Sequence, residues 1–161
     1  MNAATSRIIE QFGVILHLEG YSRVAGRVFG LLLLSEAPRA LGELADELAV
    51  SKASVSVNAR LLEQQGVVER VGQSGDRQDY YIISPDILTR TVEQRIARWQ
   101  RLLDVISATK EIVASQSDVL LARLENLEAA HRFQLASMAD ALEQWRTRPR
   151  HTSAVKQAEY A

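Results

Sequence analysis

The stretch SKASVSVNARLLEQQG, residues 51–66, decides the fold, because its middle alternates like a strand while its ends resemble a helix. Ser51 suits a helix N-cap, since its hydroxyl can accept a backbone N–H of the first turn. Gly66 suits the position just after a helix, where the backbone often becomes left-handed. The span between them exceeds the usual strand length. We therefore predict a helix over residues 51–65.

On a wheel of about 3.6 residues per turn, this helix has two contrasting faces. We expect one face to be buried, and it carries Val55, Ala59 and Leu62. The opposite face carries Ala53, Val57, Arg60 and Gln64, flanked by Ser54 and Ser56. Small side chains allow close approach to a DNA major groove, where a valine can touch a thymine methyl and an arginine can contact guanine or phosphate. The alternative is a solvated surface helix with one stray valine.

The surrounding sequence holds most of the glycine and proline turn signals of the chain. We predict helices over residues 22–35 and 41–48, separated by a turn at 36–38, before the helix over 51–65. Two strands, VVERV (67–71) and YYIIS (80–84), then flank the loop GQSGDRQD (72–79). Three helices and a hairpin in this order are the layout of a winged helix-turn-helix.

The segments on either side have helical apolar spacing. Residues 1–20 form an expected N-terminal dimerisation helix, residues 21–85 the winged helix-turn-helix, residues 86–148 a helical dimerisation arm, and residues 149–161 a flexible tail. Gly26 and Gly30 lie one helical turn apart, and we interpret them as a site of close helix packing. The expected fold is mainly α with a small β-hairpin wing.

The second half of the arm repeats apolar residues in steps of four and three, which is typical of a coiled-coil seam. That seam contains Leu120, Leu124, Leu127, His131, Gln134, Met138, Ala141 and Trp145. A small winged helix cannot bury so much apolar surface, so we expect a homodimer. The expected dimerisation residues are Ile8, Phe12, Ile15, Leu120, Leu124, Leu127, His131, Met138 and Trp145.

The stretch ELADELAVSKASVSVNARLLEQQGVVERVGQSGDRQDYYII, residues 43–83, resembles the MarR-type winged-helix regulators. With GYSRVAGRVFGLLLLSE, residues 20–36, it looks most like the GbsR branch of that family. The resemblance implies a homodimeric transcription regulator, usually a repressor, whose recognition helix covers residues 51–65. It also implies that the wing arginine, here Arg77, reaches the minor groove or its backbone and is braced by Asp76.

Taken together, the outward face and the resemblance give a set of expected DNA contacts. They are Ser51, Lys52, Ser54, Ser56, Val57, Asn58, Arg60, Gln73, Ser74 and Arg77, with Gly75 and Asp76 as wing support. Two features depart from the family pattern: Ala49 replaces the common turn glycine, and the helix over 41–48 lacks a polar N-cap. Residues 20–85 contain seven Lys and Arg against eight Asp and Glu, so we expect modest, strongly salt-dependent DNA binding.

A ligand site is a further expectation from the resemblance, because relatives in the GbsR branch are linked to choline or osmolyte control. A quaternary amine would suit an aromatic box. Its candidate residues are Phe12, Tyr21, Trp99 and Trp145, and the alternative is that these aromatics are core anchors. The partners that we expect are double-stranded DNA, a second copy of the chain and a small-molecule effector.

Several classes of function are not expected. The chain has no cysteine and no phosphate-binding loop, so we expect no enzymatic activity and no cofactor. Glu128 and His131 form an E-x-x-H pair, but no second pair occurs, and we interpret His131 as an interface residue rather than a metal ligand. We see no secretory signal or membrane span, which makes the cytoplasm the expected location. With a net charge of −1, a winged-helix module that binds protein rather than DNA remains the alternative.

Overall fold

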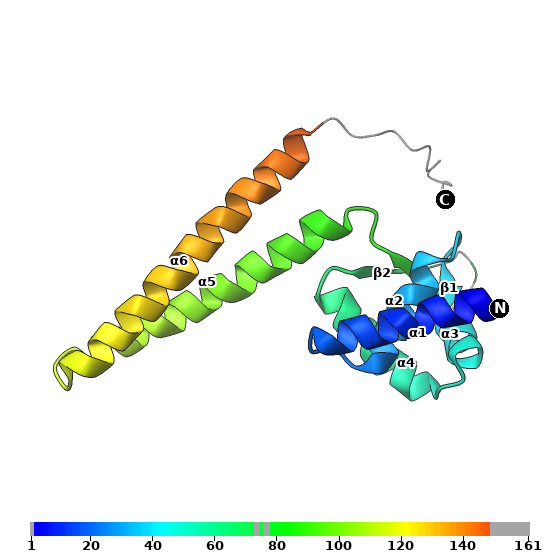
Figure 1. Cartoon of the computed structure of the whole chain (residues 1–161), viewed down its shortest axis with the longest axis horizontal. Helices are drawn as coiled ribbons and strands as arrows, with labels where there is room; N and C mark the ends of the chain where they lie inside the picture. The colour runs from blue at the N-terminus through cyan, green and yellow to red at the C-terminus, as the bar shows by residue number, and fades with distance from the viewer. Residues whose placement is uncertain (1, 73–74, 76–77, 149–161) are drawn as a thin grey trace. The chain divides into compact units, whose positions relative to one another are not determined.

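The computed structural model describes residues 2–72, 75 and 78–148, and it divides into two compact units, one ending at Arg90 and one beginning at Thr91. The first unit contains α1 (Ala3–Leu18), α2 (Arg23–Leu33), β1 (Arg39–Ala40), α3 (Leu41–Leu48), α4 (Lys52–Gln64), β2 (Val68–Val71) and β3 (Tyr80–Ile83) (Figure 1). The second contains most of α5 (Ile87–Val113) and all of α6 (Asp118–Thr147). The predicted helices and the predicted hairpin are confirmed, with boundaries within a few residues.

A short strand that we did not predict completes the sheet. The strand order is β1-β3-β2, and both pairings are antiparallel. Arg39 lies opposite Tyr81 and Ala40 opposite Tyr80, while the Leu41 amide donates to the Asp79 carbonyl at 3.2 Å. Two residues carry no periodic signal, so this strand exists only because β3 offers it a free edge.

The core of the first unit lies between the helices and the sheet. Its fully buried side chains come from every element of the predicted helix-turn-helix and from the hairpin. The largest are Tyr81, Ile9, Leu32, Leu44, Leu48, Leu62, Val28, Val55 and Val68. Ile9 is 1% exposed, so α1 contributes to the same core as the winged helix.

Glycines allow α1 and α2 to approach closely, and the packing role predicted for Gly26 and Gly30 is confirmed. A Cβ atom on Gly26 would lie 2.7 Å from the Cα of Gly13 and even closer to the carbonyl of Phe12. A Cβ on Gly30 would lie 2.9 Å from the ring of Phe12. That ring stands edge-to-face against Phe29, with centroids 5.3 Å apart.

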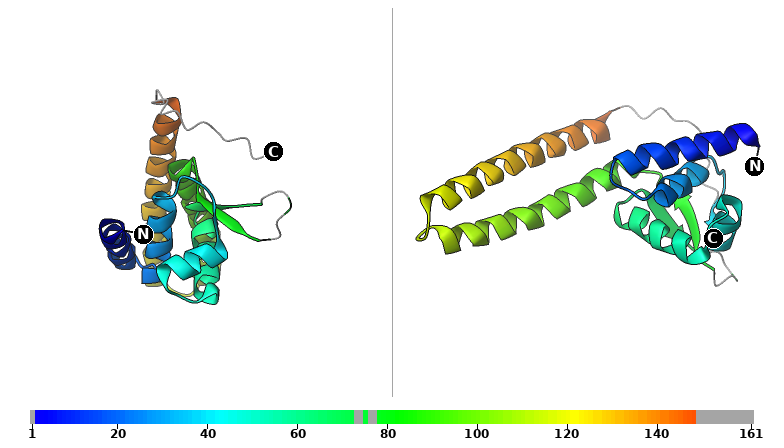
Figure 2. Two further views of the ribbon diagram at one scale, coloured as in Figure 1. Left: turned by 90° about the vertical axis from the view of Figure 1, so that its right-hand side faces the viewer. Right: turned by 60° about the horizontal axis from the view of Figure 1, so that its bottom comes forward.

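The second unit is an antiparallel helical hairpin, in which α6 returns along α5 (Figure 2). Lys110 of α5 pairs with Glu128 of α6 at 2.6 Å, and Glu93 pairs with Arg146 at 2.5 Å. Hydrogen bonds from Lys110 and Arg132 hold the pKa of Glu128 below its usual value. Trp99 packs edge-to-face on His131, with ring centroids 5.3 Å apart.

Part of the seam that we expected to face a second chain faces α5 of the same chain. His131 contacts Trp99 of α5. Leu124, Met138 and Trp145 share its side of α6 and are half-buried, whereas Leu120 and Leu127 are 41% and 42% exposed. His131 therefore has an aromatic partner within its own hairpin, and its place in an interface between two chains stays a prediction.

The hairpin leaves much apolar surface exposed. Among its described residues only Leu103 and Ile106 of α5 and Leu142 of α6 are buried. Large apolar side chains remain in contact with water, and they include Val105 at 62%, Ile112 at 64%, Val119 at 63% and Phe133 at 74% exposure. Two helices alone cannot cover all the apolar faces that this sequence encodes.

Replacing Gly26 by alanine tests the contact between α1 and α2. We expect Gly26→Ala to lower the free energy of unfolding by about 1–3 kcal/mol, because a methyl group there overlaps the backbone of α1. Gly42→Ala is the matched control, since it also lies in a helix but its Cβ would meet only the Lys52 side chain at 3.5 Å. Chemical denaturation should show Gly42→Ala unchanged or stabilised, and equal effects at the two positions would contradict the packing role.

Candidate nucleic-acid interface

Helix α4 begins and ends at the residues that the sequence indicated. The Ser51 hydroxyl accepts the backbone N–H of Ser54 at 3.1 Å and so caps the first turn. Gly66 follows the C-cap with φ +75°, and its amide donates to the Glu63 carbonyl at 2.9 Å. A Cβ on Gly66 would also lie 2.9 Å from the backbone of Arg90. Both the left-handed backbone and this close approach favour glycine.

The two faces of α4 lie as predicted. Val55, Ala59 and Leu62 are 0% exposed, whereas Val57 is 67% exposed. Ala53, Arg60 and Gln64 are exposed with Val57, and Ser54 and Ser56 are half-buried at the border of that face. The outward surface of α4 therefore consists of small side chains, one valine, one amide and one guanidinium, open to a partner.

Asn58 does not belong to this outward surface, and its prediction as a DNA contact is wrong. It is 8% exposed. Its side-chain nitrogen donates to the Ser54 carbonyl at 2.8 Å, and its oxygen accepts from the hydroxyl of Ser22, which lies 36 residues earlier. The helical wheel places Asn58 beside the buried face of Val55, Ala59 and Leu62. A single sequence does not reveal that Asn58 binds a residue as distant in the chain as Ser22.

The turn between α3 and α4 contains a left-handed residue at the position where many helix-turn-helix units have glycine. Ala49 has φ 52°, an uncommon conformation for a residue with a Cβ. Its neighbour Leu48 presents its carbonyl to the guanidinium of Arg27 at 2.7 Å. Arg27 also contacts Glu10 at 2.7 Å, so one side chain of α2 ties the turn to α1.

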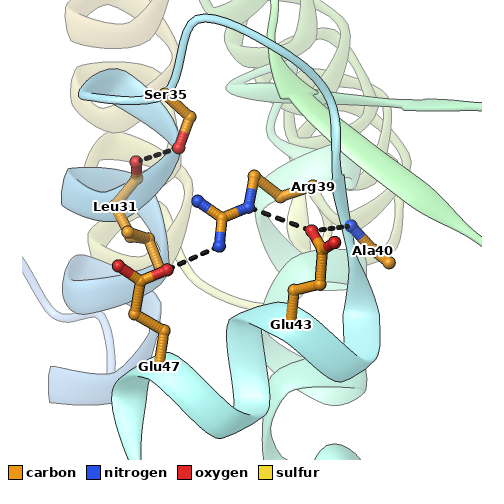
Figure 3. A network of polar contacts seen from close by, with 6 residues as sticks. All are labelled: Leu31, Ser35, Arg39, Ala40, Glu43 and Glu47. Carbon is orange, nitrogen blue, oxygen red and sulfur yellow. Dashed lines mark hydrogen bonds and ion pairs between the residues drawn. The ribbon is translucent and has the colours of Figure 1, made fainter. Parts of the chain in front are cut away.

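Helix α3 lacks a polar N-cap, as predicted, and an acidic side chain replaces it. The Glu43 carboxylate accepts the backbone N–H of Ala40 at 3.1 Å, which satisfies one donor at the start of the helix (Figure 3). The same carboxylate pairs with Arg39 at 3.0 Å, and the Arg39 guanidinium reaches Glu47 at 2.5 Å. One arginine from β1 therefore pairs with Glu43 and Glu47 of α3 and offsets one of their two negative charges.

Ion pairs engage most of the other basic side chains of the module. Arg23 and Arg27 share Glu10, and Arg70 lies 3.7 Å from Glu63 and 3.4 Å from Asp79. By contrast, Lys52 and Arg60 have no ion-pair partner within the described ranges. Among the described residues of 20–85, the basic side chains without an ion pair therefore lie on α4, although the net charge of the chain is −1.

The wing is described only at its base and at one tip residue. Strands β2 and β3 pair from Val68 with Ile83 to Val71 with Tyr80. Gly75 is exposed with φ +84°, which suits a tight hairpin tip. The expected contacts Gln73, Ser74 and Arg77, and the expected brace Asp76, lie outside the described residues.

The aromatic residues proposed for a ligand box are divided between the two units. Phe12 and Tyr21 lie in the first unit, and Trp99 and Trp145 in the second. A hollow of about 370 Å³ in the first unit is lined by Thr5, Leu31, Leu34, Ser35, Glu36, Ala37, Arg39 and Glu47, none of which is aromatic. Within each unit the contacts of Phe12 with Phe29 and of Trp99 with His131 suit packing anchors.

No group of three His, Asp or Glu side chains in the described ranges could hold a metal ion. None of the helices in that part of the chain combines the length and hydrophobicity needed to cross a bilayer.

The order helix, helix, helix, hairpin, with a capped third helix that presents an open outward face, defines a winged helix-turn-helix. Comparison with known families agrees, because the model of the MarR family matches residues 19–79. The likeness to the MarR family thus covers residues 19–79, the winged helix-turn-helix module of this chain.

Known proteins resemble the chain beyond that domain. The chain is 36% identical over 98 residues to the HTH-type transcriptional regulator MmpR5 of Mycobacterium tuberculosis, covering 60% of this chain and 59% of the relative. It is 24% identical over 141 residues to the HTH-type transcriptional repressor GbsR of Bacillus subtilis, covering 87% and 77%. The chain spans 59% and 54% of the lengths of two of its curated relatives. A crystal structure of a transcriptional regulator aligns with a TM-score of 0.84 at 27% identity, covering 90% of this chain and 99% of that one.

Introducing a carboxylate at Val57 tests the outward face of α4. Because Val57 is 67% exposed, we expect Val57→Glu to change the free energy of unfolding by less than about 0.5 kcal/mol. The new charge should repel phosphate and reduce DNA affinity by at least about tenfold. The matched control is Val55→Ala two residues away, which should cost roughly 2 kcal/mol of stability because Val55 is fully buried. Melting curves measure the stability of both variants, and fluorescence anisotropy measures their affinity for DNA. A large loss of stability from Val57→Glu would reverse the assignment of the two faces.

Proposed function

We propose that this protein is a cytoplasmic, homodimeric transcription regulator, acting as a repressor, that binds an inverted-repeat operator. Helix α4, residues 51–65 with its caps, enters the major groove, and the wing, residues 72–79, contacts the adjacent minor groove. The single observation that carries the proposal is the placement of unpaired positive charge, because Lys52 and Arg60 project from α4 without an ion pair among the described residues, while Arg39 pairs with Glu43 and Glu47 of α3.

The chemistry of α4 suits such a complex. Backbone N–H groups and Lys52 at its first turn can bind phosphate, which fixes the helix on the duplex without reading sequence. Val57 and Arg60 face outward in the next turns, and a valine methyl and a guanidinium distinguish base pairs in the major groove. The Ser54 and Ser56 side chains are small enough for the helix to approach the bases closely.

Dimerisation is supported by the apolar surface that one chain leaves exposed. Ile8 and Ile15 of α1 are 41% and 55% exposed, and Leu120 and Leu127 of α6 are 41% and 42% exposed. Isolated soluble proteins seldom leave so many large apolar side chains uncovered. A two-fold dimer would cover them and would place two α4 helices for half-sites roughly 34–36 Å apart.

The GbsR-like branch and a small-molecule effector belong to the same proposal. The 24% identity to the repressor GbsR extends over 87% of this chain and so includes the helical arm. A quaternary amine is the effector class to test first, because the resemblance to the GbsR branch implies choline or osmolyte control.

Selection of DNA fragments from a random pool on the purified protein, followed by sequencing, tests the proposed function. We expect enrichment of an inverted repeat whose half-sites lie about one helical turn apart. Arg77→Ala should weaken binding to the enriched sequence, since the wing then loses its cation. The molar mass of the protein in solution, measured by light scattering, should equal twice that of one chain. If no sequence is enriched even at low salt, the proposal is wrong and a module that binds protein is favoured.

A further inference from the structure

The hydrogen bonds of Asn58 point to a role that its burial alone does not explain. Four residues of α4 are buried, namely Val55, Asn58, Ala59 and Leu62, and Asn58 is the polar member of this set. Apolar contacts hold a helix against its neighbours but tolerate small rotations, because they have no direction. A buried amide with fixed partners does not tolerate them, since each lost hydrogen bond leaves a polar atom unsatisfied.

The orientation of the Asn58 amide follows from its partners. The Ser54 carbonyl can only accept, so the atom 2.8 Å from it is the amide nitrogen. The amide oxygen consequently faces Ser22 and accepts from its hydroxyl. The Ser22 oxygen in turn accepts the backbone N–H of Ala25 at 3.0 Å, and so caps α2. A single chain of hydrogen bonds therefore links the first turn of α2 to the backbone of α4.

This series of hydrogen bonds reaches α4 at Ser54, close to the outward face of the helix. Ser54 carries the carbonyl that Asn58 binds, and its own amide is held by the Ser51 cap at 3.1 Å. Val57 immediately precedes Asn58 and is exposed. Rotating α4 about its axis would move Val57 and Arg60 relative to a bound duplex and would also separate Asn58 from Ser22.

We propose that Asn58 and Ser22 are positioning residues, which fix the rotation of the recognition helix and thereby its discrimination between DNA sequences. The inference rests on the proposed function and deepens it, because neither residue touches DNA in this account. It predicts that breaking the bond lowers the preference for the operator more than the affinity for DNA of arbitrary sequence. Contacts to phosphate are less sensitive to orientation than hydrogen bonds to base edges.

Substitutions of Ser22 separate positioning from stability. Ser22→Asp keeps a good N-cap for α2 but removes the proton that the Asn58 oxygen accepts. Ser22→Thr keeps both the cap and the donor, and the exposure of Ser22 leaves room for the added methyl group. Asn58→Ala removes both hydrogen bonds from the side of α4.

The experiment measures the affinity of each full-length variant for the selected operator and for a scrambled duplex, at a temperature well below its melting point. We expect Asn58→Ala and Ser22→Asp to lower the ratio of the two affinities by about tenfold, the scale of one hydrogen bond left unmade in a buried site. Ser22→Thr should keep the ratio of the unmodified protein, and affinity for the scrambled duplex should change by less than about twofold in Asn58→Ala and Ser22→Thr, which add no charge.

Three results would overturn the inference and are distinguishable from one another. If the unmodified protein prefers its operator and Asn58→Ala and Ser22→Asp keep that preference, the hydrogen bonds do not position the helix and the proposed function stands. If the unmodified protein prefers no sequence, the proposed function and this inference are both wrong. A parallel loss of both affinities would also contradict positioning, because a purely structural role predicts that outcome.

Discussion

Complete burial of one face of α4 is the constraint on which the rest of the site depends. Val55, Ala59 and Leu62 are 0% exposed and belong to the same core as Leu44 of α3 and Tyr81 of β3. Because a helix with one face buried can present only the opposite face, the identity of the outward side chains follows from this core. The buried face of α4 thus determines which of its residues can contact a partner, whatever their charge.

Charge then decides what kind of partner the outward face can accept. The sequence alone raises a difficulty, since residues 20–85 contain eight acids against seven bases. The structure reduces it through Arg39, whose guanidinium binds Glu43 and Glu47 of α3 (Figure 3). Such exposed or half-exposed pairs add little to stability, but they reduce the negative field beside α4. Local ion pairing around α4, rather than the net charge of the chain, therefore decides which kind of partner the outward face can accept.

The sequence predicted the fold well where signals are local. Ser51, Gly66 and the alternation of faces along α4 set that helix correctly, and the glycines of α2 indicated its close contact with α1. Non-local partners were the source of the errors. Strand β1 exists because of an edge about 40 residues away in the chain. Asn58 was assigned to the wrong face because its partner Ser22 is 36 residues distant. His131 belongs to a repeat that looks the same whether its partner is α5 or a second chain.

The central claim is that α4 binds the DNA backbone through the unpaired Lys52, and the salt dependence of binding tests it most directly. The equilibrium constant for the operator should fall steeply as salt rises between about 50 and 200 mM, because binding releases counterions from the duplex. Replacing Lys52 by glutamine should reduce the slope of log K against log salt by about one. A slope near zero for the unmodified protein, or one that Lys52→Gln leaves unchanged, would contradict the account.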